Sequence, residues 1–349
     1  MEKRSGFSGK KRRWLHLIYY ILLVLFAASL AEVGARVKGF RPWREPRFDI
    51  TVEPGGRFYT QHPTLGYSSL PGKFKVTLNG TYSFEVTNLA NSLRATRPLD
   101  SHPAGARKGI WIFGDSITYG WSVNDRDTYC WLLQEALPDY EVVNFGVNGY
   151  GTLQSLIQLR EALKNGNEPK VVVLAYAPWQ DVRNTFIRMR RKMVATAAFL
   201  GPVNQPYARL DSNGRLEVFT DGLAYREFPL MRYSAFIHAL EETYDKYEER
   251  HSQSREITKV IIKEISDLCL AHGIKLAVAS LTSDPISSEM LEYCKREGIT
   301  TADVGVDLSI KENNNLPYDS HPSAIAHRQY AHKLESFLRS NVLNKPSGN

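Results

Sequence analysis

The chain has 349 residues, of which 43% are hydrophobic and 23% charged, a composition typical of a globular protein that buries a sizeable core. Its net charge is +7, but the first fourteen residues carry +5 of it and the rest of the chain only +2. Because a nucleic-acid surface needs Lys and Arg clustered on the folded body, this distribution excludes nucleic acid as the expected partner.

The basic tail, residues 1–14, is followed by an apolar run from Leu15 to Ala31. As a helix, this run is roughly 26 Å long at 1.5 Å per residue, the short end of what crosses a bilayer. We predict a cytoplasmic tail at 1–14, a transmembrane signal anchor at 15–35, and a single-pass protein whose body is extracytoplasmic. The alternative is a cleaved signal peptide, since residues 29–31 (Ser-Leu-Ala) offer small residues at a cleavage site.

A lead-in at residues 36–107 is rich in Pro, Gly, Arg and aromatic residues. It shows short stretches of strand-like alternation, as at Lys73–Val76 and Thr81–Val86. We therefore predict a strand-rich lead-in that packs on the main domain.

From residue 108 short apolar runs alternate with segments of helical periodicity. The runs are Ile110–Phe113, Val142–Phe145, Val171–Tyr176, Leu276–Leu281 and a weaker one near Val304–Val306. The helical segments are Tyr129–Leu137, Leu153–Leu163, Ile257–His272, Glu289–Arg296 and Ser323–Leu338. Strands that alternate with helices predict an α/β domain over 108–340, with a mostly parallel sheet and helices on both faces.

An insertion at residues 183–255 breaks this alternation. A hairpin is predicted from Tyr207–Leu210 and Arg215–Phe219, joined by a turn that ends in Asn-Gly, and a charged helix from His238–Arg250. An insertion near the strand ends is either a lid or substrate-binding flank, or a passive surface elaboration.

The three cysteines are Cys130, Cys269 and Cys294, an odd number that rules out a fully paired disulfide framework. Each lies in a stretch predicted to be helical, so we interpret all three as small buried apolar residues. A single Cys269–Cys294 disulfide is the alternative.

A candidate nucleophile follows the first core strand. The stretch from Ile110 runs into Gly114-Asp115-Ser116, so a serine lies at the C-terminal end of a buried strand, on a turn that glycine makes possible. Turn and helix-start amides at such a position can point at an oxyanion. A serine hydroxyl also needs a base, because it is a weak nucleophile on its own.

A candidate base lies near the other end of the chain, in Asp319-Ser320-His321-Pro322, just before the last predicted helix. His321 is suited to take the proton of Ser116. Asp319, two residues earlier, can bind the other ring nitrogen and stabilise the imidazolium.

Together, these motifs resemble the SGNH/GDSL hydrolase superfamily, particularly its bacterial membrane-anchored members, over residues 108–182 and 256–339 and more loosely over 30–107. The resemblance implies a three-layer α/β/α flavodoxin-like sandwich. It also implies that Ser116 is the nucleophile, with His321 and Asp319 completing the catalytic triad in an Asp-x-His variant of the last motif.

The resemblance further implies an oxyanion hole made by the amides of Ser116 and of a glycine in the second motif. We assign Gly149 from Val143–Gly151, with Gly146 as the alternative. The third motif usually supplies an asparagine, where this chain has Gln180. The glutamine amide can donate the same bond but is one methylene longer, and Asn148 and Asn184 are possible substitutes.

These residues predict a serine ester hydrolase, either a carbohydrate O-deacetylase or a carboxylesterase, acting on cell-envelope esters such as an acylated polysaccharide. The alternatives are an O-acetyltransferase that modifies an exopolysaccharide, and a non-catalytic glycan-binding protein with a degenerate site. The sequence holds no His-Glu-x-x-His, Gly-x-Gly-x-x-Gly or Gly-Lys-Ser motif, so we predict neither a metal nor a cofactor.

Overall fold

The computed structural model describes residues 7–46, 49–101, 108–164, 166, 168–197, 200, 204–222 and 224–343, with side chains from residue 11 onward. The first six residues of the predicted tail and the last six of the predicted lead-in lie outside the described residues. The chain divides into two compact units. One consists of Met1–Pro46 and Tyr225–Glu248, the other of Arg47–Ala224 and Glu249–Asn349.

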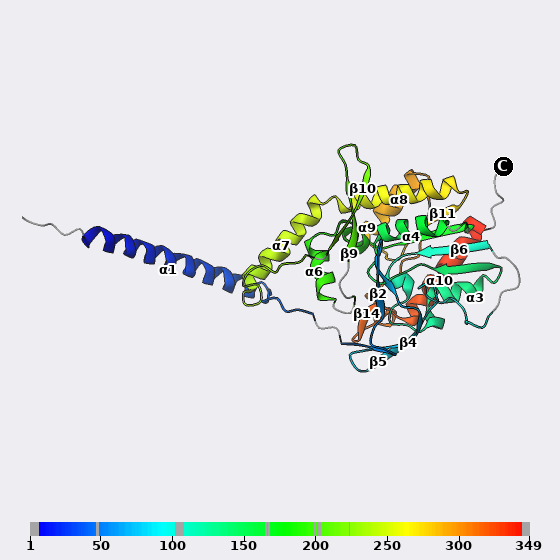
Figure 1. The fold of residues 1–349 in the computed structure, drawn as a ribbon, viewed down its shortest axis with the longest axis horizontal. Helices are drawn as coiled ribbons and strands as arrows, with labels where there is room; N and C mark the ends of the chain where they lie inside the picture. The colour runs from blue at the N-terminus through cyan, green and yellow to red at the C-terminus, as the bar shows by residue number, and fades with distance from the viewer. Residues whose placement is uncertain are drawn as a thin grey trace, which may run out of the picture. The chain divides into compact units, whose positions relative to one another are not determined.

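The second unit is built on a parallel five-stranded sheet (Figure 1). Its strands, in spatial order, are β12 (Thr300–Asp303), β11 (Lys275–Ser280), β8 (Val171–Tyr176), β6 (Lys108–Phe113) and β7 (Tyr140–Asn144). The order reverses between β6 and β8, as in flavodoxin-like sheets, and the carboxyl ends of strands at such a reversal are where ligands bind.

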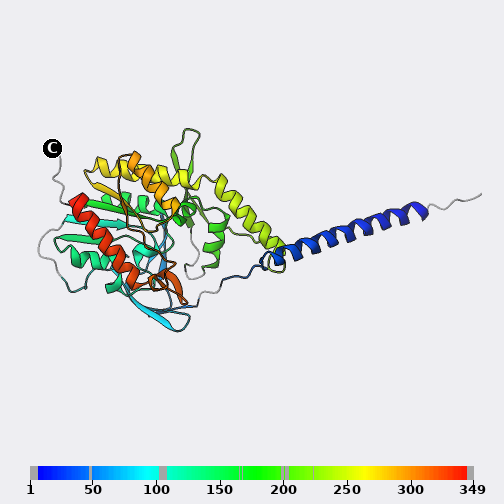
Figure 2. The same cartoon turned by 180° about the vertical axis from the view of Figure 1, so that it is seen from behind.

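Helices cover both faces of the sheet, because side chains of successive strand residues alternate between two separate cores. One face packs against α3 (Tyr129–Ala136) and α10 (Ala324–Leu338), the red helix that crosses the sheet in Figure 2. The other packs against α4 (Thr152–Lys164), α8 (Ser254–Ala271) and α9 (Pro285–Arg296). The predicted three-layer α/β/α fold is confirmed.

The local sequence pattern predicted most core elements, but the last strand lies a few residues earlier in the chain than the predicted run near Val304–Val306. It spans Thr300–Asp303 and pairs with β11, whereas Val304 and Val306 follow it as buried residues of the core. The hydrophobicity of Val304 and Val306 thus indicates burial in the core and not pairing in the sheet. All three cysteines are free and buried, as predicted, so there is no Cys269–Cys294 disulfide.

The lead-in is rich in strands and shares a core with the main domain. β1 (Ile50–Glu53), β4 (Gly72–Leu78) and β5 (Tyr82–Asn88) form an antiparallel sheet, and β2 (Tyr59–His62) pairs with β3 (Gly66–Ser69). Their buried aromatic residues pack against Trp121 and Tyr150, which follow the first two core strands.

The insertion contains both predicted features with longer bounds. The hairpin is formed by β9 (Asn204–Leu210) and β10 (Leu216–Gly222), and the charged helix is α7 (Ala235–His251). Two further helices precede them, α5 (Trp179–Thr185) and α6 (Arg188–Thr196). Short helical turns also occur among the described residues, at η1 (Asp125–Asp127), η3 (Lys311–Asn313) and η4 (Arg339–Leu343).

The first unit joins the N-terminal helix to part of the insertion. In α1 (Phe7–Val37), the stretch Lys11–Val37 is long and apolar enough to cross a membrane. Glu32 near its end accepts hydrogen bonds from the hydroxyl of Ser234 at 2.7 Å and from two amides at the start of α7 at 3.0 Å. A carboxylate suits the N-terminus of a helix, so α1 and α7 are fastened together within this unit.

Candidate active site

Ser116 lies at the junction between β6 and a four-residue helix, α2 (Ser116–Tyr119). Asp115 caps this helix, because its Oδ1 accepts a hydrogen bond at 3.0 Å from the amide two residues on. Gly114 permits the turn, since a Cβ there would clash with a side chain of α2. This nucleophile turn, residues 114–120, presents Ser116 at the carboxyl edge of the sheet.

His321 and Asp319 lie in β14 (Asp319–Pro322), which pairs with β13 (Asn314–Asn315) just before α10. His321 Nε2 is 2.9 Å from Ser116 Oγ, and His321 Nδ1 is 2.6 Å from Asp319 Oδ1. The structure therefore brings together three side chains that the sequence analysis had selected. We call residues 314–322 the base segment.

The carboxylate determines which ring nitrogen of His321 carries the proton. An ionised carboxylate only accepts, so Nδ1 is assigned as the donor to Asp319, which leaves the Nε2 lone pair facing the Ser116 hydroxyl. Burial acts to raise the pKa of Asp319, but the hydrogen bonds and charge of His321 outweigh it and hold this pKa below its usual value. The carboxyl group is thus ionised at neutral pH and can stabilise an imidazolium.

The lead-in supports the base segment. The ring of Tyr82 stacks on that of Tyr318, with centroids 5.3 Å apart, and its hydroxyl donates to the Ser122 carbonyl at 2.6 Å. Asn79, in the turn between β4 and β5, donates to the Tyr318 carbonyl at 3.1 Å. Sequence reasoning missed these residues, because nothing in a strand-rich segment indicates which loop it will contact.

Two backbone amides are available to an oxyanion. Neither the Ser116 nor the Gly149 amide donates to an acceptor in the described part of the chain. Gly149 has φ +78°, and a Cβ there would lie 2.6 Å from the hydroxyl of Tyr67. By contrast, the Gly146 amide is already bound to the Asn144 side chain at 2.9 Å. The geometry thus favours Gly149 over Gly146.

Gln180 does not occupy the position expected of an oxyanion donor. It is buried, and its amide nitrogen donates to the main-chain oxygen of Ala175 at 3.0 Å. Asn184 uses its amide on Thr152 and Thr258, and Asn148 donates to the hydroxyl of Tyr59 at 2.7 Å. In this structure all three amides are engaged by other groups. The Gln180 side chain reaches back to the preceding strand, β8, through its bond to Ala175.

Two arginines that the sequence analysis passed over support the site. Arg183 Nη1 donates to Asp115 Oδ2 and to the Tyr150 carbonyl, both at 2.9 Å, so it joins the nucleophile turn to the loop that carries Gly149. Arg190 is buried and donates to the Gly149 carbonyl at 2.7 Å. Burial lowers the pKa of Arg190 from its usual value. A buried cation that holds this carbonyl orients the peptide chain at Gly149.

Within the described residues, no three His, Cys, Asp or Glu side chains lie close enough together to hold a metal ion. The chemistry proposed below uses only the hydroxyl, imidazole, carboxylate and amide groups of the site.

No protein-family model matches the sequence, and no curated protein sequence matches it. Among solved structures, the chain is similar to TesA, with 15% identity, TM-score 0.41, and 68% of this chain and 100% of that chain covered. A member of the lipolytic protein G-D-S-L family from Veillonella parvula matches with 14% identity and TM-score 0.38, over 66% and 99% of the two chains.

An acetyl xylan esterase, Est2A, from the rumen bacterium Butyrivibrio proteoclasticus matches with 13% identity and TM-score 0.37, over 86% of this chain and 85% of that chain. These identities and scores are too low to assign an activity.

Proposed function

We propose that the protein is a serine ester hydrolase with Ser116 as nucleophile, His321 as general base and Asp319 as the group that orients the base. The observation that supports this most strongly is the continuous hydrogen-bonded relay from hydroxyl to imidazole to carboxylate. It joins side chains 205 residues apart in the sequence at 2.9 Å and 2.6 Å. A non-catalytic glycan-binding site would not require this complete relay.

The reaction begins when Ser116 Oγ attacks the ester carbonyl carbon and His321 Nε2 takes its proton. The carbonyl oxygen becomes an oxyanion, which the amides of Ser116 and Gly149 stabilise. The tetrahedral intermediate then collapses, the imidazolium gives its proton to the departing alcohol, and acyl-Ser116 is left. Water, deprotonated by His321, attacks this acyl group, releases the carboxylic acid and restores the serine.

The two amides carry the oxyanion in this proposal, and Gln180 acts as a packing residue. Removal of one oxyanion donor typically costs roughly 10²–10³ in rate, so a site without the third donor remains a catalyst with reduced activity. Arg190 and Arg183 act by orienting the peptide at Gly149 and the turn at Ser116.

The proposal includes a membrane anchor rather than a cleaved signal peptide. The helix α1 continues without a break past Ala31, the end of the possible cleavage site, to Val37. Glu32 is one residue beyond that site and caps α7 through three hydrogen bonds. A continuous helix that is hydrogen-bonded to α7 suits a retained anchor. The catalytic unit would then act outside the cytoplasm on esters of envelope molecules, including O-acylated polysaccharides.

A fluorophosphonate probe tests the nucleophile, because it reacts only with an activated serine. We expect the detergent-solubilised full chain to be labelled at Ser116, and Ser116→Ala to lose labelling while it keeps the wild-type melting temperature. Ser320→Ala is the matched control, since Ser320 lies between His321 and Asp319 and has no part in the relay. Absence of labelling in wild type, under conditions that label a known serine esterase, would contradict the proposal.

A further inference from the structure

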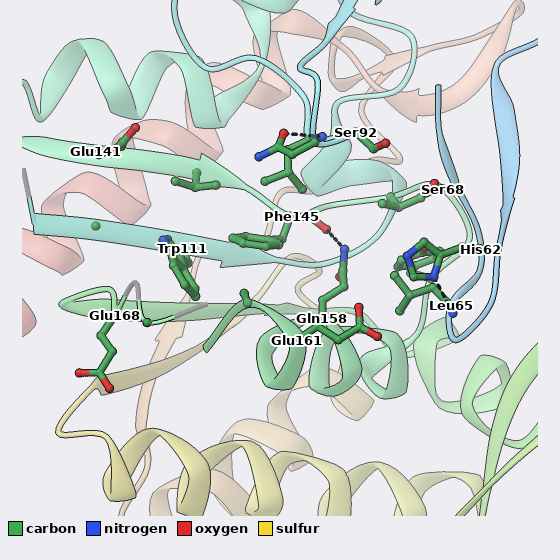
Figure 3. A pocket seen from close by; sticks show the side chains of 18 residues that line it. His62, Leu65, Ser68, Ser92, Trp111, Glu141, Phe145, Gln158, Glu161 and Glu168 are labelled. Atoms are coloured by element: carbon green, nitrogen blue, oxygen red, sulfur yellow. Dashed lines mark hydrogen bonds between the residues drawn. The ribbon is translucent and has the colours of Figure 1, made fainter. Parts of the chain in front are cut away.

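A pocket separate from the candidate active site lies beside the edge strand β7, where α4 leaves part of β6 and β7 uncovered (Figure 3). Its volume is about 660 Å³, within the roughly 300–1,000 Å³ that small-molecule sites occupy. Trp111 and Val143 are paired in register on adjacent strands and Phe145 follows on the same face, so the floor is apolar. Neither Ser116 nor His321 lines this pocket.

One buried polar atom in this pocket has no partner. Gln158 on α4 is 8% exposed, and its amide nitrogen donates to the Phe145 carbonyl at 3.2 Å. Its Oε1 is buried and accepts no hydrogen bond from any described residue. Figure 3 shows the Gln158 side chain rising from α4 into the pocket, beside Glu161. A buried amide oxygen without a donor is costly, and a ligand hydroxyl at this position would satisfy it.

Further hydrogen-bond donors and acceptors line the same pocket. Glu161 Oε1 accepts from Thr64 at 2.7 Å, which leaves its second oxygen for a ligand. His62 Nδ1 accepts from the Leu65 amide at 3.2 Å, so the proton of the neutral ring is assigned to Nε2, which can donate. Trp111 also lines the pocket, and its indole N–H is a further hydrogen-bond donor. The pocket thus offers hydrogen-bond donors and acceptors above an apolar floor.

The charge of the lining determines the class of ligand. Glu141, Glu161 and Glu168 line the pocket, whereas none of the described lining residues is Lys or Arg. Glu141 is paired with Arg97 at 2.8 Å and Glu168 with His272 at 2.7 Å, whereas Glu161, among the described residues, is bound only by the neutral hydroxyl of Thr64. An anionic ligand would meet the Glu161 carboxylate with no lysine or arginine among the described lining residues, which disfavours it. A neutral molecule with many hydroxyl groups can donate to the carboxylates and to Gln158, and can lay its C–H face on the apolar floor.

We propose that this pocket binds a neutral sugar unit of a polysaccharide. The sugar ring lies against Trp111 and Phe145, and its hydroxyls donate to Gln158 and Glu161. Val147 and Tyr150 line the same pocket and flank Gly149, so the pocket and the candidate active site share the loop between β7 and α4. A polysaccharide bound here is held at the loop that carries the proposed oxyanion donor.

Binding of defined hexasaccharides to the full chain in detergent micelles tests the proposal. We expect cellohexaose or N-acetylchitohexaose to bind in calorimetry and to change tryptophan fluorescence, and hexagalacturonate, which is anionic, not to bind. Gln158→Met removes the amide oxygen at nearly constant volume, and Glu161→Gln removes the charge. Each should weaken binding about tenfold, whereas Glu256→Gln, at an exposed position of α8 that does not line the pocket, is the matched control and should bind as wild type does.

The proposal would be overturned by the absence of binding of either neutral hexasaccharide at millimolar concentration, or by binding that neither Gln158→Met nor Glu161→Gln weakens. Preferential binding of hexagalacturonate would also overturn it, since the ligand class would be wrong. Glu161→Gln keeps the test decisive if Gln158→Met fails to fold, as judged by its melting temperature. The measurement involves no ester turnover, so its failure would leave the proposed hydrolase activity untouched.

Discussion

The nucleophile turn and the base segment meet at one hydrogen bond, but they are held in place in different ways. The nucleophile turn is buried and local: Asp115 caps the helix that begins at Ser116, and Gly114 permits the bend. The base segment consists of short paired strands, and residues far away in the sequence, Asn79 and Tyr82, support it. The position of Ser116 is therefore determined by its neighbours in the sequence, and that of His321 by tertiary packing.

The largest effect is expected within the base segment itself. Asp319→Asn preserves shape but lets the side chain donate, so His321 adopts the wrong tautomer and kcat should fall roughly 10⁴-fold. Hydrolysis of a short p-nitrophenyl ester, followed together with the melting temperature, measures this. Asp307→Asn, an exposed aspartate outside the site, is the control and should be active. Near-normal turnover in Asp319→Asn would remove Asp319 from the relay.

Arg190→Met extends the comparison to the loop at Gly149, which is also held by a remote residue. Loss of the bond to the Gly149 carbonyl should misplace the amide and lower kcat by about 10-fold to 100-fold, less than the loss of an oxyanion donor, with little change in KM. Arg190→Lys should restore part of the rate. Arg191→Met is the matched control, since Arg191 bonds to the Phe186 carbonyl instead. An equal loss in both variants would point to general damage of α6.

His327, a buried histidine close to the base segment, is expected to make the stability of the fold depend on pH. Burial, with the nearby charges of Arg94 and His321, lowers the pKa of His327 to about 3. The unfolded chain, with an ordinary histidine pKa near 6.5, binds the proton first as the pH falls. Stability is therefore lost as the pH drops from 6.5 toward 3, by about 2 kcal/mol at pH 5 from this group alone.

His327→Gln should remove this part of the acid sensitivity. We expect a smaller fall in melting temperature between pH 7 and pH 5 than in wild type, by a few degrees. His332→Gln, on the exposed side of the same helix, should keep the wild-type dependence. If both variants behaved alike, protonation of His327 would not contribute.

Tyr82→Ala tests most directly whether the lead-in supports the base. Loss of the stack on Tyr318 and of the bond to Ser122 should lower kcat by about tenfold, since each contact is typically worth about 1 kcal/mol. Tyr82→Phe keeps the stack and should lose less. Labelling by the fluorophosphonate should slow in the same order, and Ser83→Ala, a neighbour on β5, should not change it. A fully active Tyr82→Ala would show that the base segment holds itself in place.

Much of the fold follows from local pattern. The apolar runs and helical periodicity from residue 108 onward predicted the core elements, because strands and helices present different spacings of buried side chains along the chain. The exception, the strand at Thr300–Asp303, shows that the hydrophobicity of Val304 and Val306 reports burial and not pairing. Ser116, His321 and Asp319 were recognisable as candidate site residues because they stand in short motifs next to those elements.

Tertiary structure alone decided the remaining parts of the site. Whether Gln180 faces an oxyanion or the Ala175 carbonyl depends on which strand its longer side chain reaches. That Arg190 holds Gly149, and that Asn79 and Tyr82 hold the base segment, depends on contacts between distant segments. A side chain's neighbours along the sequence specify its local conformation, but its hydrogen-bond partner is chosen only when remote segments pack together and exclude water.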